Sequence, residues 1–354
     1  MCIQNYEILS GDNLVALWQN NELTIYNDKL LPMFLKNVSN ADMWLERRSI
    51  DSHRANSRLL KKALRMKEKS DVATAVRANG ATITDNYWIR EPGSSLKYSD
   101  VGFDENYFRK LTSKSAAKLA LNGSSSSFNY VARCSDSPVA ELTNTGSFEK
   151  CWKNIDGKWW LFKSANKNEQ FSEVFISKLC DEIGIKCAVY EKGAGYVKSL
   201  DFTEGKVNFE PAFSFMGEEE DYNLVVNKLK EICPEAIPNY IRLIFLDALV
   251  FNPDRHTANF GLLRNKKTGA FTGLSPCFDH NMALISRGYP TGKSKSDLLI
   301  SLFRDLIKEN PQYKKYIPKV TEEAINQALS TTGMRVNSEA IRKFITNRYN
   351  LITA

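Results

Sequence analysis

The chain has 354 residues, of which 43% are hydrophobic and 25% are charged. This composition is typical of globular proteins and excludes a disordered or collagen-like chain, and the length predicts two domains or a two-lobed fold with an extension. The first residues lack a basic stretch leading into an apolar run, as a secretory signal would have. The most apolar stretch, near residues 241–251, is too short to span a bilayer. We therefore expect a cytoplasmic protein with no membrane contact.

The cysteines carry a second piece of evidence about the compartment. There are seven of them, an odd number, and no two stand at CxxC spacing. This pattern disfavours a disulfide framework and a zinc site. We interpret the cysteines as mostly small buried hydrophobic residues in a reducing compartment.

The excess positive charge lies in one short segment. Residues 46–69 contain nine basic and three acidic residues, so this segment carries +6 of the chain's net +7. Such a segment could bind nucleic acid, but it lacks the interleaved aromatic residues that single-strand binders use for stacking. We favour the alternative interpretation, a solvated helix face, and do not favour a nucleic-acid partner.

The first third of the chain is predicted to be helical. Leucine and phenylalanine recur at three- and four-residue steps between residues 29 and 69. A serine-rich stretch at residues 121–127 then reads as a linker. The sequence therefore predicts a mainly helical, basic N-terminal extension over residues 1–128.

After the linker, strand and helix signals alternate. Strands are predicted at 139–142, 158–162 and 195–199, with Asp156-Gly157 forming a hairpin turn. A helix over 168–183 should end at Gly184, and later helices are predicted at 222–232, 238–251, 296–308, 321–329 and 338–350. The predicted fold class is α+β, with a small β-rich lobe over about 129–203 and a helical lobe over about 204–354.

The most informative motif follows the helix predicted at 238–251. Pro253 must break that helix, and Asp254 and Asn259 stand in the polar loop after it. A second acid, Asp279, lies at the far end of the next predicted hairpin. One carboxylate to orient a hydroxyl, with an amide oxygen and a second carboxylate to hold Mg²⁺, is an arrangement suited to phosphoryl transfer.

The segment Asn252-Pro-Asp-Arg-His-Thr-Ala-Asn-Phe-Gly261 resembles the catalytic loop of HipA-like serine/threonine kinases, in particular their small stand-alone members. Phe278-Asp279 is similar to that family's counterpart of the kinase DFG motif. The resemblance covers roughly residues 139–350. It implies a two-lobed, protein-kinase-like fold with ATP and Mg²⁺ as cofactors, Asp254 as the catalytic base, and Asn259 and Asp279 as Mg²⁺ ligands.

The resemblance also assigns residues to nucleotide binding by their order in the chain: Lys163, Glu173, Gly146, Ser147, Ser199, Leu200, Phe202 and His256. Lys163 would contact the phosphates and Glu173 would pair with it, with Glu169 as the alternative. The phosphate loop has one glycine where ordinary protein kinases have three. Ser147 would be a site of autophosphorylation, which should switch the enzyme off because added negative charge repels the phosphates of ATP. Arg255 could pair with a phosphorylated residue or substrate, or could be a solvated loop residue.

Partners and alternatives follow from the same resemblance. It implies an unidentified protein substrate, a helix-turn-helix antitoxin or another regulator as partner, and a toxin or effector acting in a bacterial cytoplasm or delivered into a host cell. One alternative is a metal-dependent phosphatase or nuclease built on Asp254, His256, Asp279 and His280. The other is a catalytically silent kinase fold that binds nucleic acid or protein through its basic N-terminal region.

Overall fold

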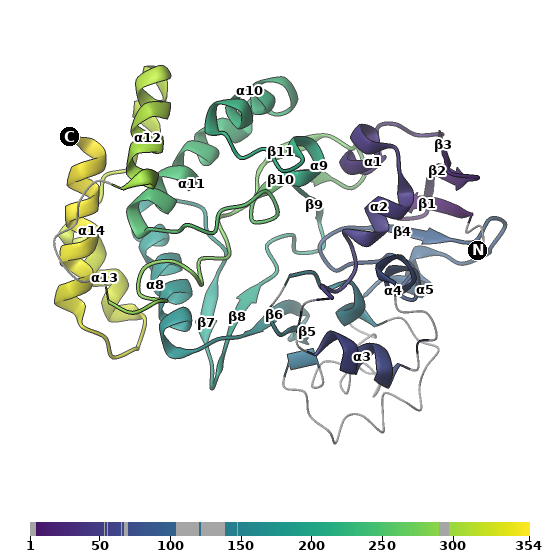
Figure 1. Cartoon of the computed structure of the whole chain (residues 1–354), viewed down its shortest axis with the longest axis horizontal. Coiled ribbons are helices and arrows are strands. Elements are labelled where there is room, and N and C mark those ends of the chain that lie inside the picture. The colour runs from purple at the N-terminus through teal and green to yellow at the C-terminus, as the bar shows by residue number, and fades with distance from the viewer. Residues whose placement is uncertain are drawn as a thin grey trace. The chain divides into compact units, whose positions relative to one another are not determined.

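Figure 1 shows the computed structural model of the chain, coloured from the N-terminus to the C-terminus. The residues it describes are 5–52, 54, 56–64, 66, 70–103, 120–121, 139–146, 148–289 and 297–354. The chain forms two compact units: unit 1 contains residues 1–164, 203–210 and 264–270, and unit 2 contains 165–202, 211–263 and 271–354. The domain boundary predicted near residue 128 lies outside the described residues and stays a prediction. Over the described ranges, no helix has the length and apolar character needed to cross a membrane.

Unit 1 begins with a sheet that the sequence analysis did not predict. Within the described residues it has four antiparallel strands in the order β3-β2-β1-β4: β1 (Tyr6–Ser10), β2 (Asn13–Gln19), β3 (Glu22–Ile25) and β4 (Tyr87–Arg90). Its first three strands are short and are joined by two-residue turns. Asn20 and Asn21 both adopt positive φ in the second turn, which asparagine tolerates better than most residues.

The helical prediction for residues 29–69 is correct in type, but the segment forms three short helices: α1 (Met33–Val38), α2 (Ala41–Glu46) and α3 (Ser57–Ala63). Ser39 ends α1 in the left-handed conformation, and the Asn40 side chain caps α2 by accepting from the Met43 N–H. Because each cap satisfies backbone groups locally, the chain can change direction between the helices. Two further short helices follow, α4 (Asp71–Val76) and α5 (Tyr98–Val101).

The strand predicted at 139–142 is wrong, because this segment forms the 3-10 helix η2 (Ala140–Thr143). Its apolar side chains Val139 and Leu142 are buried with Ile50 and Leu60. The Leu142 carbonyl accepts a 2.7 Å hydrogen bond from the Ile50 N–H. Packing against the helices of unit 1 therefore decides the conformation, since the short apolar run fits either structure.

The predicted hairpin at Asp156-Gly157 is confirmed. Strands β5 (Lys150–Ile155) and β6 (Lys158–Ser164) pair in antiparallel register, and the two turn residues adopt φ of 51° and 77°. Two consecutive positive φ values are typical of a type I′ turn, whose twist matches that of the strands. The Trp152 and Trp159 rings meet edge to face at 6.4 Å, so they pack against each other.

The basic segment 46–69 is not a uniformly solvated face. Of its described basic residues, Arg48, Arg54 and Lys61 are buried. Arg48 forms a two-point ion pair with Asp85, and Lys61 pairs with Asp71. Arg54 donates to the carbonyls of Ala120, Asn144 and Lys150, and its burial lowers its pKa to about 10. These three charged side chains therefore form internal contacts that stabilise unit 1.

Unit 2 is mainly helical. Its helices and strands are α8 (Lys167–Ile183), β7 (Tyr190–Lys192), β8 (Tyr196–Leu200), α9 (Phe213–Met216), α10 (Tyr222–Ile232), η3 (Pro234–Ala236), α11 (Ile237–Val250), β11 (Phe271–Leu274), α12 (Leu298–Glu309), η4 (Pro311–Tyr316), α13 (Glu322–Thr331) and α14 (Ser338–Thr353). Two strands straddle the unit boundaries, β9 (Val207–Pro211) and β10 (Gly261–Asn265). Helix α11 contacts α10, α12 and α14 and is the central helix of this unit (Figure 1).

Candidate functional site

The candidate site begins where α11 ends. Almost every side chain of α11 is buried, and the helix stops at Val250, followed by Phe251 in the left-handed conformation with φ of 52°. Pro253 cannot continue the helix because it has no N–H to donate. The chain therefore leaves the core at a fixed point, and residues 254–259 form a loop anchored at the end of a rigid helix.

Hydrogen bonds within the loop hold Asp254 and Asn259 together. The Asn259 Nδ2 donates a 3.0 Å hydrogen bond to the Asp254 carbonyl, and the His256 N–H donates to the same carbonyl at 3.1 Å. Asp254 thus contributes to the loop through its backbone, while its side chain is half-buried. Because Nδ2 is engaged, Oδ1 is the side-chain atom of Asn259 that can serve as a ligand.

Arg255 connects this loop to the segment that carries Asp279. Its Nη1 donates to two carbonyls, that of Asn259 at 2.6 Å and that of Phe278 at 2.8 Å. Its Nε and Nη2 donate to the two carboxylate oxygens of Asp247, at 2.8 Å and 2.9 Å. One guanidinium therefore fixes the end of α11, the Asp254–Asn259 loop and the residue before Asp279.

The Arg255–Asp247 ion pair is almost completely buried, with side chains 4% and 1% exposed. Burial alone would lower the pKa of Arg255, but the charge of Asp247 and its hydrogen bonds outweigh that effect, so the pKa lies above its ordinary value. Asp247 also accepts from the Asn252 amide at 2.8 Å. Arg255 is consequently neither a solvated loop residue nor exposed for a phosphorylated partner.

The segment after β11 places Asp279 in an unusual backbone conformation. Its φ is 60°, in the left-handed region that few non-glycine residues adopt. The Asp279 N–H donates to the Tyr190 hydroxyl at 3.0 Å, and the N–H of the next residue, His280, donates to Glu173 Oε2 at 2.9 Å. Burial, with the neighbouring charges of Glu173 and Asp279, raises the pKa of Tyr190 well above its ordinary value, so it stays a neutral hydroxyl.

The two glutamates considered as partners of Lys163 make different contacts in α8. Glu169 closes a capping box, because its side chain accepts from the Asn166 N–H while Asn166 accepts from the Glu169 N–H. Glu173 lies one turn further on and is completely buried. Glu169 therefore serves the helix end, and Glu173 contacts the segment that carries Asp279.

Three of the residues predicted to bind the nucleotide lie on or just after β8. Ser199 and Leu200 are half-buried on the β7–β8 hairpin, and Ser199 is the register partner of Tyr190. The Phe202 ring stacks on the Phe278 ring with centroids 5.4 Å apart. Both rings pack on a buried apolar cluster of unit 2 that includes Val197. Phe202 is thus brought next to the residue that precedes Asp279.

Two predicted nucleotide-binding residues belong to unit 1. Lys163 lies in β6, is 7% exposed, and its Nζ stands 4.6 Å from the Phe148 ring centroid. Gly146 adopts φ of 96°, and a Cβ there would come within 2.5 Å of the Lys150 Nζ. Ser147 lies outside the described residues, so its predicted phosphorylation stays a prediction.

His256 and the two predicted metal ligands, Asn259 and Asp279, complete the comparison with the sequence predictions. The His256 ring is exposed, and its Nδ1 accepts from the Ala258 N–H at 3.3 Å, a local turn contact. Asn259 and Asp279 offer an amide oxygen and a carboxylate, the hard donors that Mg²⁺ prefers. Among the described residues, no three histidine, cysteine or acidic side chains gather into a metal-binding group.

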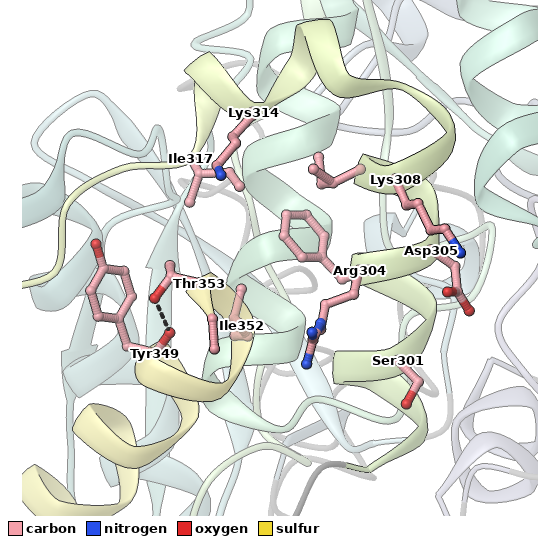
Figure 2. Close-up of a pocket in the computed structure, with 12 residues that line it drawn as sticks. Ser301, Arg304, Asp305, Lys308, Lys314, Ile317, Tyr349, Ile352 and Thr353 are labelled. Carbon is pink, nitrogen blue, oxygen red and sulfur yellow. Dashed lines mark hydrogen bonds between the residues drawn. The ribbon is translucent and has the colours of Figure 1, made fainter.

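A separate pocket of about 780 Å³ lies elsewhere in unit 2 (Figure 2). It is lined by residues of α12, η4 and α14, among them Arg304, Lys314 and Ile352. None of the predicted site residues lines it. The Arg304 side chain points into the space between the helices, while Lys314 and Ile317 border its opposite side.

Three residues that organise the site were not predicted: Asp247, Tyr190 and, in its positioning role, Arg255. Asp247 carried a signal in the sequence, because it is an acid inside an otherwise apolar helix and must therefore find a partner. Arg255, eight residues later, is a cation of the right kind for two-point binding. Tyr190 carried no comparable local signal.

The comparisons with known proteins establish the fold. No family model and no curated protein matches the chain. HipA of the Shewanella oneidensis MR-1 toxin–antitoxin system, solved with HipB and its operator DNA, aligns over 98% of this chain and 95% of its own, with a TM-score of 0.56 and 10% identity. The Helicobacter pylori proinflammatory kinase CtkA aligns over 58% of this chain and 91% of its own, with a TM-score of 0.45 and 16% identity. The chain has a HipA-like fold of the predicted α+β class.

Proposed function

We propose that this chain is an ATP-dependent serine/threonine protein kinase of HipA type. The observation that carries the proposal is the clamp made by Arg255, which joins the Asp254–Asn259 loop to the segment bearing Asp279. The two loops carry a general base and two oxygen ligands for Mg²⁺, and one buried cation fixes both loops. Such an arrangement is a preorganised phosphoryl-transfer site.

Each residue of the site has a distinct task. The Asp254 carboxylate orients the hydroxyl of the protein substrate and accepts its proton as transfer proceeds. Asn259, through Oδ1, and Asp279, through its carboxylate, would hold Mg²⁺, which when bound offsets the negative charge on the phosphate oxygens. Since the transition state of phosphoryl transfer is loose, positioning and charge compensation supply most of the rate.

The predicted nucleotide contacts complete the proposal. Lys163 pairs with the ATP phosphates, and Glu173 keeps Lys163 and the Asp279 segment in place. Phe202, with Ser199 and Leu200, borders the adenine ring. The acid buried in α8 and the aromatic pair beside Asp279 support these assignments.

The biological setting follows the same reasoning. We propose autophosphorylation, with Ser147 as the acceptor, and a toxin- or effector-like role for the kinase. A helix-turn-helix regulator is the partner that HipA-type toxins suggest, and HipA of Shewanella oneidensis was solved with HipB and its operator DNA. Direct nucleic-acid binding by this chain is less favoured, because Arg48, Arg54 and Lys61 are buried in internal contacts.

The test is incubation of the full chain with ATP and Mg²⁺, followed by intact mass measurement. We expect wild-type protein to gain phosphate, and to gain none when EDTA removes Mg²⁺. Asp254→Ala and Asp279→Ala should abolish the gain, whereas Asp181→Asn, an exposed acid near the end of α8, should retain it. Wild-type-like phosphorylation by either alanine variant would refute the assignment of that residue.

A negative result for the wild-type chain needs a second measurement. Binding of a fluorescent ATP analogue that weakens in Asp279→Ala would indicate a kinase that requires its protein substrate. No nucleotide binding by the folded wild-type chain would refute the proposed function.

A further inference from the structure

Three cysteines meet in unit 2 in a way that the proposed kinase function does not explain. Cys187 and Cys277 are partners in a parallel β-bridge. The Cys277 N–H donates to the Lys186 carbonyl at 2.9 Å, and the Ala188 N–H donates to the Cys277 carbonyl at 2.8 Å. Because Cys277 bonds to the residues on both sides of Cys187, the register between the two cysteines is fixed. A third thiol, Cys180 near the end of α8, shares a side-chain hydrogen bond with Cys187.

The spacing of the bridge suits a disulfide. Paired strands run about 4.8 Å apart, and disulfides join Cα atoms separated by about 4.4–6.8 Å. The side chains of two β-bridge partners project from the same face of the pair. Both thiols are free in this structure. The backbone therefore already holds Cys187 and Cys277 at a separation that a disulfide can span.

The two cysteines differ in exposure, which sets the order of events. Cys187 is half-buried, whereas Cys277 and Cys180 are buried. A small oxidant arriving from solvent therefore meets Cys187 first, with Cys277 directly beside it to complete the reaction.

We propose that Cys187 and Cys277 are a modification site, at which a peroxide forms a reversible disulfide. Hydrogen peroxide first transfers one oxygen atom to the Cys187 sulfur, giving a sulfenic acid and one water. The Cys277 thiol then attacks that sulfur: the S–S bond forms, the S–O bond breaks, and the hydroxyl leaves as water with the thiol proton. The two cysteines together lose two electrons and the peroxide gains them, and a dithiol reductant reverses the change.

The site is tied to the segment next to it in the chain. Cys277 immediately precedes Phe278, whose carbonyl Arg255 holds. A disulfide would add a covalent bond between this segment and the chain that leads from α8 into β7. Its formation does not require kinase activity, so the inference stands apart from the proposed function.

Peptide mapping of the full chain tests the site. After treatment with hydrogen peroxide, non-reducing digestion should yield a peptide in which Cys187 is linked to Cys277, and dithiothreitol should remove it. Cys187→Ser should abolish the link. Cys233→Ser, a change at another buried cysteine of unit 2, should retain it. A Cys187–Cys180 link in place of this one, or no link at all, would overturn the proposal.

A second measurement shows whether the folded chain accommodates the bond. The disulfide closes a long loop and therefore restricts the unfolded chain. The oxidised protein should unfold a few degrees above the reduced protein, and the difference should vanish in Cys187→Ser. A lower unfolding temperature after linkage would mean that the bond distorts the native backbone, and would also overturn the proposal.

Discussion

Arg255→Met should destabilise unit 2 more than any exposed substitution, because it removes the cation that binds three segments. The change deletes two hydrogen bonds to Asp247 and the contacts to the carbonyls of Asn259 and Phe278. It leaves the Asp247 carboxylate, 1% exposed, with the Asn252 amide as its side-chain partner. Breaking a buried ion pair from one side costs about 3–5 kcal/mol, and we expect a loss of that size.

A double-mutant cycle separates the ion pair from the rest of the effect. Asp247→Asn in the Arg255→Met background neutralises the stranded charge while keeping an acceptor for Asn252. We therefore expect the double variant to be about 2 kcal/mol more stable than the sum of the single losses predicts, within the range measured for contacting residues. Since the pKa of Arg255 lies above its ordinary value, the pair should persist at pH 9 as at pH 6.

Hydrogen exchange in increasing urea is the suitable assay, because a chain of two units need not unfold in one step. The peptides to follow cover residues 244–262 and 274–284. Arg304→Met, at an exposed arginine on α12, is the matched control and should change stability by less than about 0.5 kcal/mol. A loss below about 1 kcal/mol for Arg255→Met, or strict additivity in the cycle, would refute the reasoning.

Two further predictions concern single groups. Tyr190→Phe removes the hydroxyl that accepts a hydrogen bond from the Asp279 N–H. Leaving such a buried group unsatisfied costs about 1–3 kcal/mol. We therefore expect the Mg²⁺ concentration for half-maximal phosphorylation to rise about tenfold. An unchanged Mg²⁺ requirement would contradict this role. Gly269→Ala would place a Cβ 1.9 Å from the Lys29 carbonyl oxygen, whereas Gly205→Ala, at a similar φ, meets open space. We expect Gly205→Ala to cost about 1 kcal/mol in urea unfolding of unit 1 and Gly269→Ala clearly more; equal losses would show that the Lys29 contact is unimportant.

The elements that the sequence predicts well are those that begin or end at a local capping or turn residue. Gly184 adopts φ of 73° and ends α8 where expected, and Asp221 caps α10 by accepting from two backbone N–H groups. The Asp156-Gly157 turn fixes the register of its hairpin in the same local way. Such signals act over a few residues, so they can be recognised without knowledge of the fold.

Two of the missed elements depend on distant partners, whereas the β1–β2 and β2–β3 hairpins have local two-residue turns that could have been recognised. Strand β4 pairs with β1, which lies about eighty residues earlier in the chain. The segment at η2 takes its conformation from contacts with Ile50 and Leu60. Neither partner can be identified from periodicity, because a short apolar run is compatible with a strand or with a buried turn of helix.

The candidate site also has one part that local sequence signals predict and another part that depends on distant contacts. The spacing of Asp254, Asn259 and Asp279 indicated the chemistry, but it could not say what brings the two loops together. Arg255 brings the loops together. In the sequence it is one more charged loop residue, whereas in the structure it forms an ion pair with Asp247. Since a buried charge must be compensated, Asp247 in the apolar face of α11 required a cation, and the loop that follows the helix supplies it. The ion pair therefore fixes the positions of the two loops, just as the capping side chains fix the ends of the helices. The double-mutant cycle on this ion pair is also a test of how the site is assembled.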